Sequence, residues 1–125
     1  MNISRNFIVI GMIYVLIGML LGAHMAASGN HAAGGAHAHI NLIGFVMMVL
    51  FGLCYRVFPD LANSGLARLH FWLHQAGALV FLISLYLLLS GRVGEPTLVP
   101  FLLIGEVALI LGTALFAWNA LKNIS

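Results

Sequence analysis

Residues 7–27 have the sequence FIVIGMIYVLIGMLLGAHMAA, and no Asp, Glu, Lys or Arg interrupts this apolar run. A helix needs about 20 mostly apolar residues to cross the hydrocarbon core of a bilayer. The run is longer than the apolar core of a secretory signal, and its last residues, Met25-Ala26-Ala27, form a poor cleavage site. We therefore expect a membrane-spanning helix here.

Three further stretches have the same character. They cover residues 37–58, 69–89 and 98–118, and the short connections between them carry Gly, Pro, Asn and Ser. None of the runs alternates apolar and polar residues, so a membrane β-barrel is excluded. The sequence predicts an all-α membrane protein, with residues 1–125 forming a single domain of four transmembrane helices joined by short loops.

The overall composition supports a membrane protein. Hydrophobic residues make up 62% of the 125 residues, charged residues make up 6%, and the mean hydropathy is +1.09. A soluble domain carries about 25% charged residues, and a disordered chain needs low hydrophobicity. The few basic residues are scattered, which gives no indication of nucleic-acid binding. With Cys54 as the single cysteine, an intrachain disulfide is excluded.

Basic residues in the short loops predict the orientation. Four of them lie at the end of the membrane where the chain begins, and only Arg92 lies at the other end; the four are Arg5, Arg56, Arg68 and Lys122. Cytoplasmic loops carry the excess of Lys and Arg. We expect both termini in the cytoplasm of a bacterial-type inner membrane.

Small residues recur at helical spacing, with Gly18 and Gly22 forming a GxxxG pair and Gly77, Gly105 and Gly112 lying on later helices. Such stripes let helix backbones approach closely in lipid. The sequence leaves open whether they pack helices within one chain or between chains of a homo-oligomer.

The chemistry of the chain is concentrated in its histidines. Ionisable groups inside a span are costly and mark functional sites. Helix geometry places His24 about 10 Å, His39 about 13 Å and Glu106 about 3 Å outward of the membrane midplane. His37 lies beside His39, and His31 lies in the outer loop. Interfacial histidines also serve as polar anchors, and Glu106 also suits a protonated hydrogen-bonding acid, so these alternatives stay open.

His70 and His74 form a separate pair at the start of the third helix. They are four residues apart and share a helix face, a spacing that can chelate one metal ion. Arg68 and Trp72 beside them are typical of an interface belt, which favours an anchoring role instead. We expect a vertical gap of about 20 Å between His39 and His74.

One part of the second stretch resembles a known family. The run His39-Ile40-Asn41-Leu42, followed by Phe51-Gly52, Tyr55 and Phe58-Pro59-Asp60, resembles helix two of subunit I in the haem–copper oxidase superfamily, especially the nitric oxide reductase and cbb3-type branches. In that family the histidine of His-x-Asn is an axial ligand of a low-spin haem b. The resemblance therefore implies haem b bound by His39, with Asn41 hydrogen-bonding nearby.

The family's later helices have no counterpart in this chain. They carry the second haem ligand, the high-spin haem ligand and the copper histidines, so the resemblance does not imply oxygen or nitric oxide reduction. His24 is the best second ligand within the chain by depth, followed by His37 or a histidine of a partner subunit. The outer histidines and Glu106 could also hold a copper ion beside the haem.

Two classes of function follow. The first is a haem b protein for electron transfer or gas binding that receives electrons from a respiratory-chain donor. If it is an enzyme, it is a haem-dependent oxidoreductase. The second is a haem-free accessory or assembly protein for a respiratory oxidase that binds copper or zinc through His24, His31, His37 and His39. A purely structural subunit of a respiratory complex is a third interpretation.

Overall fold

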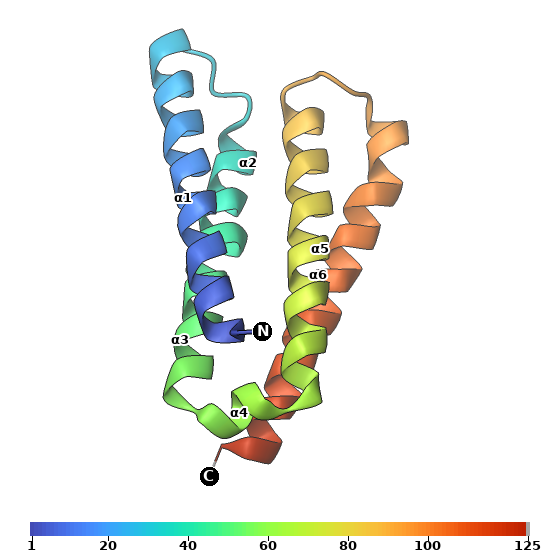
Figure 1. Cartoon of the computed structure of the whole chain (residues 1–125). Coiled ribbons are helices and arrows are strands. Elements are labelled where there is room, and N and C mark those ends of the chain that lie inside the picture. Colours follow the sequence, from blue (N-terminus) through green and yellow to red (C-terminus); the bar gives the residue numbers. More distant parts are fainter. Residues whose placement is uncertain (125) are drawn as a thin grey trace.

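The four apolar stretches form four long helices in the computed structural model, which describes residues 1–124 (Figure 1). The elements in chain order are α1 (Ile3–Ser28), α2 (Gly34–His39), the π-helix η1 (Ile40–Met47), α3 (Met48–Val57), α4 (Pro59–Asn63), α5 (Gly65–Leu89) and α6 (Glu95–Asn123). The elements α2, η1 and α3 follow one another without a break and make up the second span. Residues 1–124 contain no strand, which confirms the all-α prediction.

The helices extend beyond the predicted spans, and side-chain caps explain two of the new starts. The Asn2 side chain accepts a hydrogen bond from the Arg5 amide at 3.0 Å, so α1 begins at Ile3. The Ser64 hydroxyl accepts from the Ala67 amide at 3.3 Å, so α5 begins at Gly65. Hydropathy marks only the part of a helix that matches the hydrocarbon core, whereas a cap satisfies free amides further out.

The second span contains an unpredicted π-helix. It covers Ile40–Met47, directly after His39. Gly44 lies within it, and a Cβ at that position would meet the Tyr14 ring at 2.6 Å. π-Helical turns are rare and occur often at functional sites. Glycine at position 44 therefore allows the Tyr14 ring to lie directly on the backbone of the widened helix.

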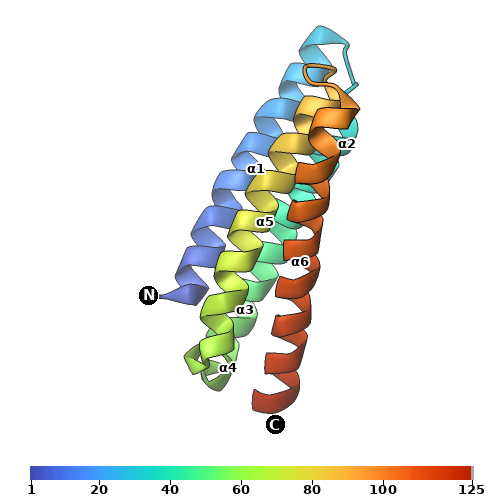
Figure 2. The same cartoon turned by 90° about the vertical axis from the view of Figure 1, so that its right-hand side faces the viewer.

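The helices form two hairpins, shown side by side in Figure 1. In one, α1 packs along η1 and α3; in the other, α5 packs along α6. The short helix α4 joins them, and both chain ends lie toward the α4 end of the molecule (Figures 1 and 2). Both chain ends therefore lie at one end of the four-helix molecule.

Glycines make close contacts between helices of the same chain. Gly18 faces the Asn41 side chain, and Gly22 faces the His37 ring. Gly105 of α6 lies against the backbone of Phe81 in α5, where an added Cβ would come within 2.7 Å of the Phe81 nitrogen. The GxxxG pair at Gly18 and Gly22 therefore packs against the second span of the same chain.

Large apolar side chains cover the outside of the molecule. Leu20 is 72% exposed, Met19 is 63% exposed and Ile104 is 62% exposed, although each lies far from a helix end. A soluble monomer rarely exposes apolar surface on this scale. All four long helices have the length and hydropathy to cross a membrane. The chain is therefore a multi-pass membrane protein whose outer surface meets lipid.

A polar contact near α4 fixes the relation between the hairpins. Asn119 of α6 is fully buried, and its side-chain amide donates to the Leu61 carbonyl of α4 at 3.0 Å. The Ser64 hydroxyl donates to Asn119 Oδ1 at 2.8 Å. These bonds tie the connecting segment to the end of α6, and they were not predicted from the sequence.

Candidate metal and cofactor sites

His39 is the last residue of α2 and lies on the exposed surface of the chain. Its Nδ1 lies 2.7 Å from the carbonyl oxygen of Gly35, one helical turn earlier, and its ring centroid lies 5.8 Å from that of Phe81 in α5. A carbonyl oxygen can only accept, so Nδ1 carries the proton in this contact. The lone pair of the imidazole is therefore on Nε2, which is a free donor atom for a metal.

His37 differs from His39 because both of its nitrogens are engaged. Its Nδ1 donates to the Gly18 carbonyl at 2.8 Å, and its Nε2 lies 3.3 Å from the side-chain nitrogen of Asn41. The ring thus joins α1 to the second span. His37 and Asn41 form a structural contact with each other, and neither contacts His39 through a hydrogen bond among residues 1–124.

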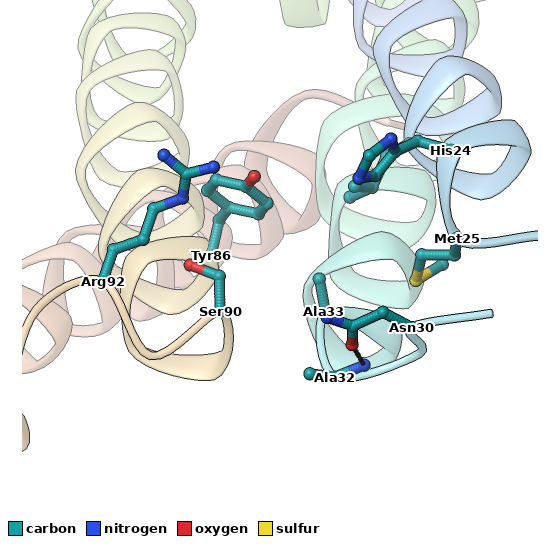
Figure 3. Close-up of a pocket in the computed structure, with 9 residues that line it drawn as sticks. His24, Met25, Asn30, Ala32, Ala33, Tyr86, Ser90 and Arg92 are labelled. Atoms are coloured by element: carbon teal, nitrogen blue, oxygen red, sulfur yellow. Dashed lines mark hydrogen bonds between the residues drawn. The ribbon is translucent and has the colours of Figure 1, made fainter. Parts of the chain in front are cut away.

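His24 lies in a separate outer pocket of about 120 Å³ (Figure 3). Across this pocket from His24 lie Tyr86 and Arg92, which come from the α5–α6 hairpin. The Arg92 guanidinium carbon is 5.9 Å from the centroid of the Tyr86 ring. Phe81, the neighbour of His39, is about 140° around α5 from Tyr86, so the two histidines lie on different sides of that helix.

The outer pocket continues into an apolar cleft between the hairpins. The cleft has a volume of about 630 Å³ and shares Leu21 and Tyr86 with the pocket. Its other lining residues come from α1, η1 and α5: Ile13, Tyr14, Ile17, Leu20, Ile40, Leu79, Leu82 and Ile83. A polar mouth at His24 and Arg92 therefore opens onto an apolar space that faces lipid.

The remaining outer residues are exposed. His31 lies in the connection between α1 and α2, and its carbonyl accepts from the Gly34 amide at 3.0 Å. Glu106 is on α6 between the exposed residues Ile104 and Val107. Within residues 1–124, no three or more His, Cys, Asp or Glu side chains are grouped so that they could hold a metal ion.

An apolar groove lies between η1 and α6. It has a volume of about 360 Å³ and is lined by Ile43, Met47, Leu109, Ile110, Thr113, Ala114 and Ala117. His39 precedes Ile43 by four residues, and Glu106 precedes Ile110 by four residues, so each lies about one turn outward on the same face of its span. Neither His39 nor Glu106 is among the residues that line the groove.

The histidine pair of α5 is buried in the core, which contradicts its interpretation as an interface anchor. His70 and His74 are both 0% exposed, whereas Trp72 between them is 59% exposed. Because α5 begins at Gly65, the pair lies deeper than the predicted start at residue 69 implied. Arg68 and Trp72 lie on the exposed face of the same helix. Their residue types therefore indicated the surroundings of that face and not those of the buried face that carries the histidines.

The vertical gap predicted between His39 and His74 is also wrong. His74 Nε2 lies 3.2 Å from the carbonyl oxygen of Ile43, which is only four residues after His39. Four residues of helix rise about 6 Å. The prediction of about 20 Å assumed helices that start at their hydropathy limits, whereas the actual second and third spans begin earlier and overlap in depth.

Aromatic rings surround the buried pair. The His70 centroid lies 4.5 Å from that of Phe51, 5.1 Å from that of Phe7 and 5.3 Å from that of Phe116. These rings come from α3, α1 and α6, so all four spans meet at the histidines. The Tyr55 hydroxyl lies 2.8 Å from His70 Nδ1 and is the polar contact of that ring.

Each buried imidazole has one satisfied and one unsatisfied nitrogen. His70 Nδ1 contacts Tyr55 and His74 Nε2 contacts Ile43, whereas His70 Nε2 and His74 Nδ1 have no hydrogen-bond partner among residues 1–124. A buried polar atom without a partner costs about 1–3 kcal/mol. Two such atoms lie on adjacent turns of one helix.

Sequence reasoning found the spacing of this pair but missed its surroundings. Tyr55 belongs to the stretch that resembles a family helix, and nothing in the sequence distinguishes Phe7 or Phe116 from the other aromatic residues of the spans. An aromatic residue in an apolar span looks the same whether it faces lipid or the core. No pattern in the sequence therefore predicted that these rings meet around His70.

Comparisons with known proteins do not assign the chain to a family. No protein-family profile, curated protein or solved structure matches it.

Proposed function

We propose that the chain is a haem b-binding protein of a bacterial-type inner membrane, distantly related to subunit I of the haem–copper oxidases, and that His39 is the axial ligand of the iron. The geometry of His39 supports this proposal: Nδ1 donates to the Gly35 carbonyl, and Nε2 is free on the exposed face. Metal-binding histidines usually donate their other N–H to a carbonyl or carboxylate. The Gly35 contact thus holds the ring in the tautomer that binds iron.

The surroundings of His39 also fit a porphyrin. Phe81 lies beside the ring, and the apolar groove between η1 and α6 begins one turn further into the membrane. Haem supplies the electron-transfer or gas-binding chemistry when it is bound, whereas the protein orients it and tunes its potential. The roles of this chain are to bind the iron through His39, to fix the imidazole through Gly35 and to exclude water with apolar side chains.

The second axial position is not filled from within the chain. Both nitrogens of His37 are engaged, and His24 faces a pocket on another side of α5. We therefore assign this position to His39 of the partner subunit in a homo-oligomer, which also explains why His39 is exposed in a single chain. With both termini in the cytoplasm, the haem lies in the outer half of the membrane, where a respiratory-chain donor reduces it.

The exposed carboxyl group of Glu106 supports association between copies. Ionisable side chains within a span almost always face the protein interior or a partner, because lipid does not solvate them. Glu106 instead lies among lipid-facing side chains of α6. A contact with a second copy would remove it from lipid.

The visible spectrum of the protein purified from haem-replete cells tests the proposal. We expect a Soret band with one haem b per pair of chains, and its loss in His39→Ala. His31→Ala is the matched control, because it removes an exposed imidazole outside the spans. A colourless protein, or a Soret band that persists in His39→Ala, would refute the assignment.

Two further measurements separate the related interpretations. Reduced protein with two histidine ligands does not bind carbon monoxide, so a shift of the Soret band with carbon monoxide would place a gas in the second position. Metal analysis that finds copper or zinc without iron would support the haem-free accessory protein instead.

A further inference from the structure

We propose that His70 and His74 form a second, buried metal site, separate from His39, that binds a single Cu(I) ion. The site is defined by the two unsatisfied nitrogens, His70 Nε2 and His74 Nδ1, on side chains that are 0% exposed. The proposal does not depend on haem binding at His39, because His39 lies at the surface without any contribution from the residues of the buried site.

The separation of the rings suits one bridging metal ion. Their centroids are 5.9 Å apart, with an interplanar angle of 71°. A metal bonded to a ring nitrogen at about 2.0 Å lies about 3.2 Å from the ring centroid, so two rings on one ion can be up to about 6.4 Å apart. The rings of His70 and His74 are therefore within the range that one ion can bridge without a change in the helix.

The other nitrogen of each ring is held in the manner of a metal ligand. His74 Nε2 donates to the Ile43 carbonyl, so the lone pair of His74 is on Nδ1, the unsatisfied atom. When His70 Nδ1 donates to the Tyr55 oxygen, the lone pair of His70 is on Nε2, the other unsatisfied atom. With His70 in this tautomer, Tyr55 and Ile43 are positioning groups, and both lone pairs lie on the unsatisfied nitrogens.

The chemistry of the cage favours a monovalent ion of low coordination number. The acidic residues of the chain, Asp60, Glu95 and Glu106, are exposed, so no carboxylate offsets a second positive charge beside the buried pair. Structural Zn²⁺ takes four ligands in a tetrahedron, and this site offers two nitrogens. Cu(I) has a filled d shell and a low coordination number, and copper is a metal that imidazole suits; the separation of 5.9 Å between the ring centroids corresponds to an angle of about 135° at an ion bonded to both rings.

The aromatic side chains favour a cation over a water molecule. Phe7, Phe51 and Phe116 lie within 5.3 Å of the His70 centroid, centroid to centroid. A buried water needs two to four polar partners, and the two imidazole nitrogens would supply only the minimum number. The faces of aromatic rings attract a cation and need no hydrogen bond from it.

Anaerobic titration of the purified, copper-depleted protein with Cu(I), in competition with bicinchoninate, tests the proposal. We expect one Cu(I) per chain and an X-ray absorption spectrum of a two-coordinate ion with nitrogen at about 2.0 Å. His24→Ala and His39→Ala remove exposed imidazoles and should keep this ion, whereas His70→Gln and His74→Gln should lose it. His39→Ala should therefore lose haem and keep copper, so failure of one site is distinguishable from failure of the other.

A conservative pair of variants keeps the test decisive if the glutamine variants do not fold. Tyr55→Phe removes the hydroxyl that orients His70 and should weaken Cu(I) binding about 10- to 100-fold, as loss of such an outer contact does. Tyr14→Phe is the matched control, because Tyr14 packs against Gly44 and is not a contact of the pair. Absence of bound Cu(I) in the wild-type protein, an ion with four ligands, or equal affinities in the two tyrosine variants would overturn the proposal and leave a buried water as the occupant.

Discussion

Substitution of Gly105 by alanine should destabilise the pair of helices α5 and α6. The added Cβ would lie 2.7 Å from the backbone nitrogen and 2.9 Å from the Cα of Phe81. Contacts this short with backbone atoms force the helices apart, and overpacking costs about 1–3 kcal/mol. Alanine gains about 1 kcal/mol over glycine in helix propensity, which partly offsets that cost.

Gly112→Ala on the same helix is the matched control. Its Cβ would meet the nearest atoms of His70 and Leu73 at 3.5 Å, an ordinary contact distance. Both variants gain the same helix propensity, so the difference between them isolates the clash. We expect Gly105→Ala to be less stable than Gly112→Ala by about 1–3 kcal/mol.

Equilibrium unfolding in mixed micelles, followed by circular dichroism, measures this difference. Phe81 lies between Gly105 and His39, so the clash should also disturb the haem spectrum in Gly105→Ala and not in Gly112→Ala. Equal stability of the two variants would show that α5 and α6 do not approach each other as described, and would refute the reasoning.

Two other predictions concern polar side chains. Asn119→Ala should lower the free energy of unfolding by about 1–3 kcal/mol, because it removes a buried side chain that donates to the Leu61 carbonyl and accepts from the Ser64 hydroxyl; Asn123→Ala, at the end of α6, should cost less in the same unfolding assay, and equal costs would contradict this role. Glu106→Leu should weaken self-association, measured by energy transfer between labelled chains in vesicles, whereas Val107→Leu should leave it unchanged. Stronger association of Glu106→Leu would indicate that the carboxyl group faces lipid and not a second copy.

The sequence predicted the four spans because hydropathy is a property of each segment alone. Residues 7–27 and 98–118, for example, are long and apolar enough to span a bilayer, however the helices pack against one another. The exact ends were less predictable, because α1 and α5 begin at caps formed by Asn2 and Ser64, outside the hydrophobic runs.

The sequence by itself thus determined that this chain is a four-helix membrane protein, and the i, i+4 spacing determined that His70 and His74 share a face. Only the tertiary structure decided which way that face points, because in lipid an apolar neighbourhood does not distinguish the core from the surface. His70 and His74 became the buried pair through contacts from Phe7, Phe51 and Tyr55, which lie on two other spans. The same packing left His39 exposed with one nitrogen free, whereas the contact of its other nitrogen with the Gly35 carbonyl is local to α2 and follows from the i, i+4 spacing.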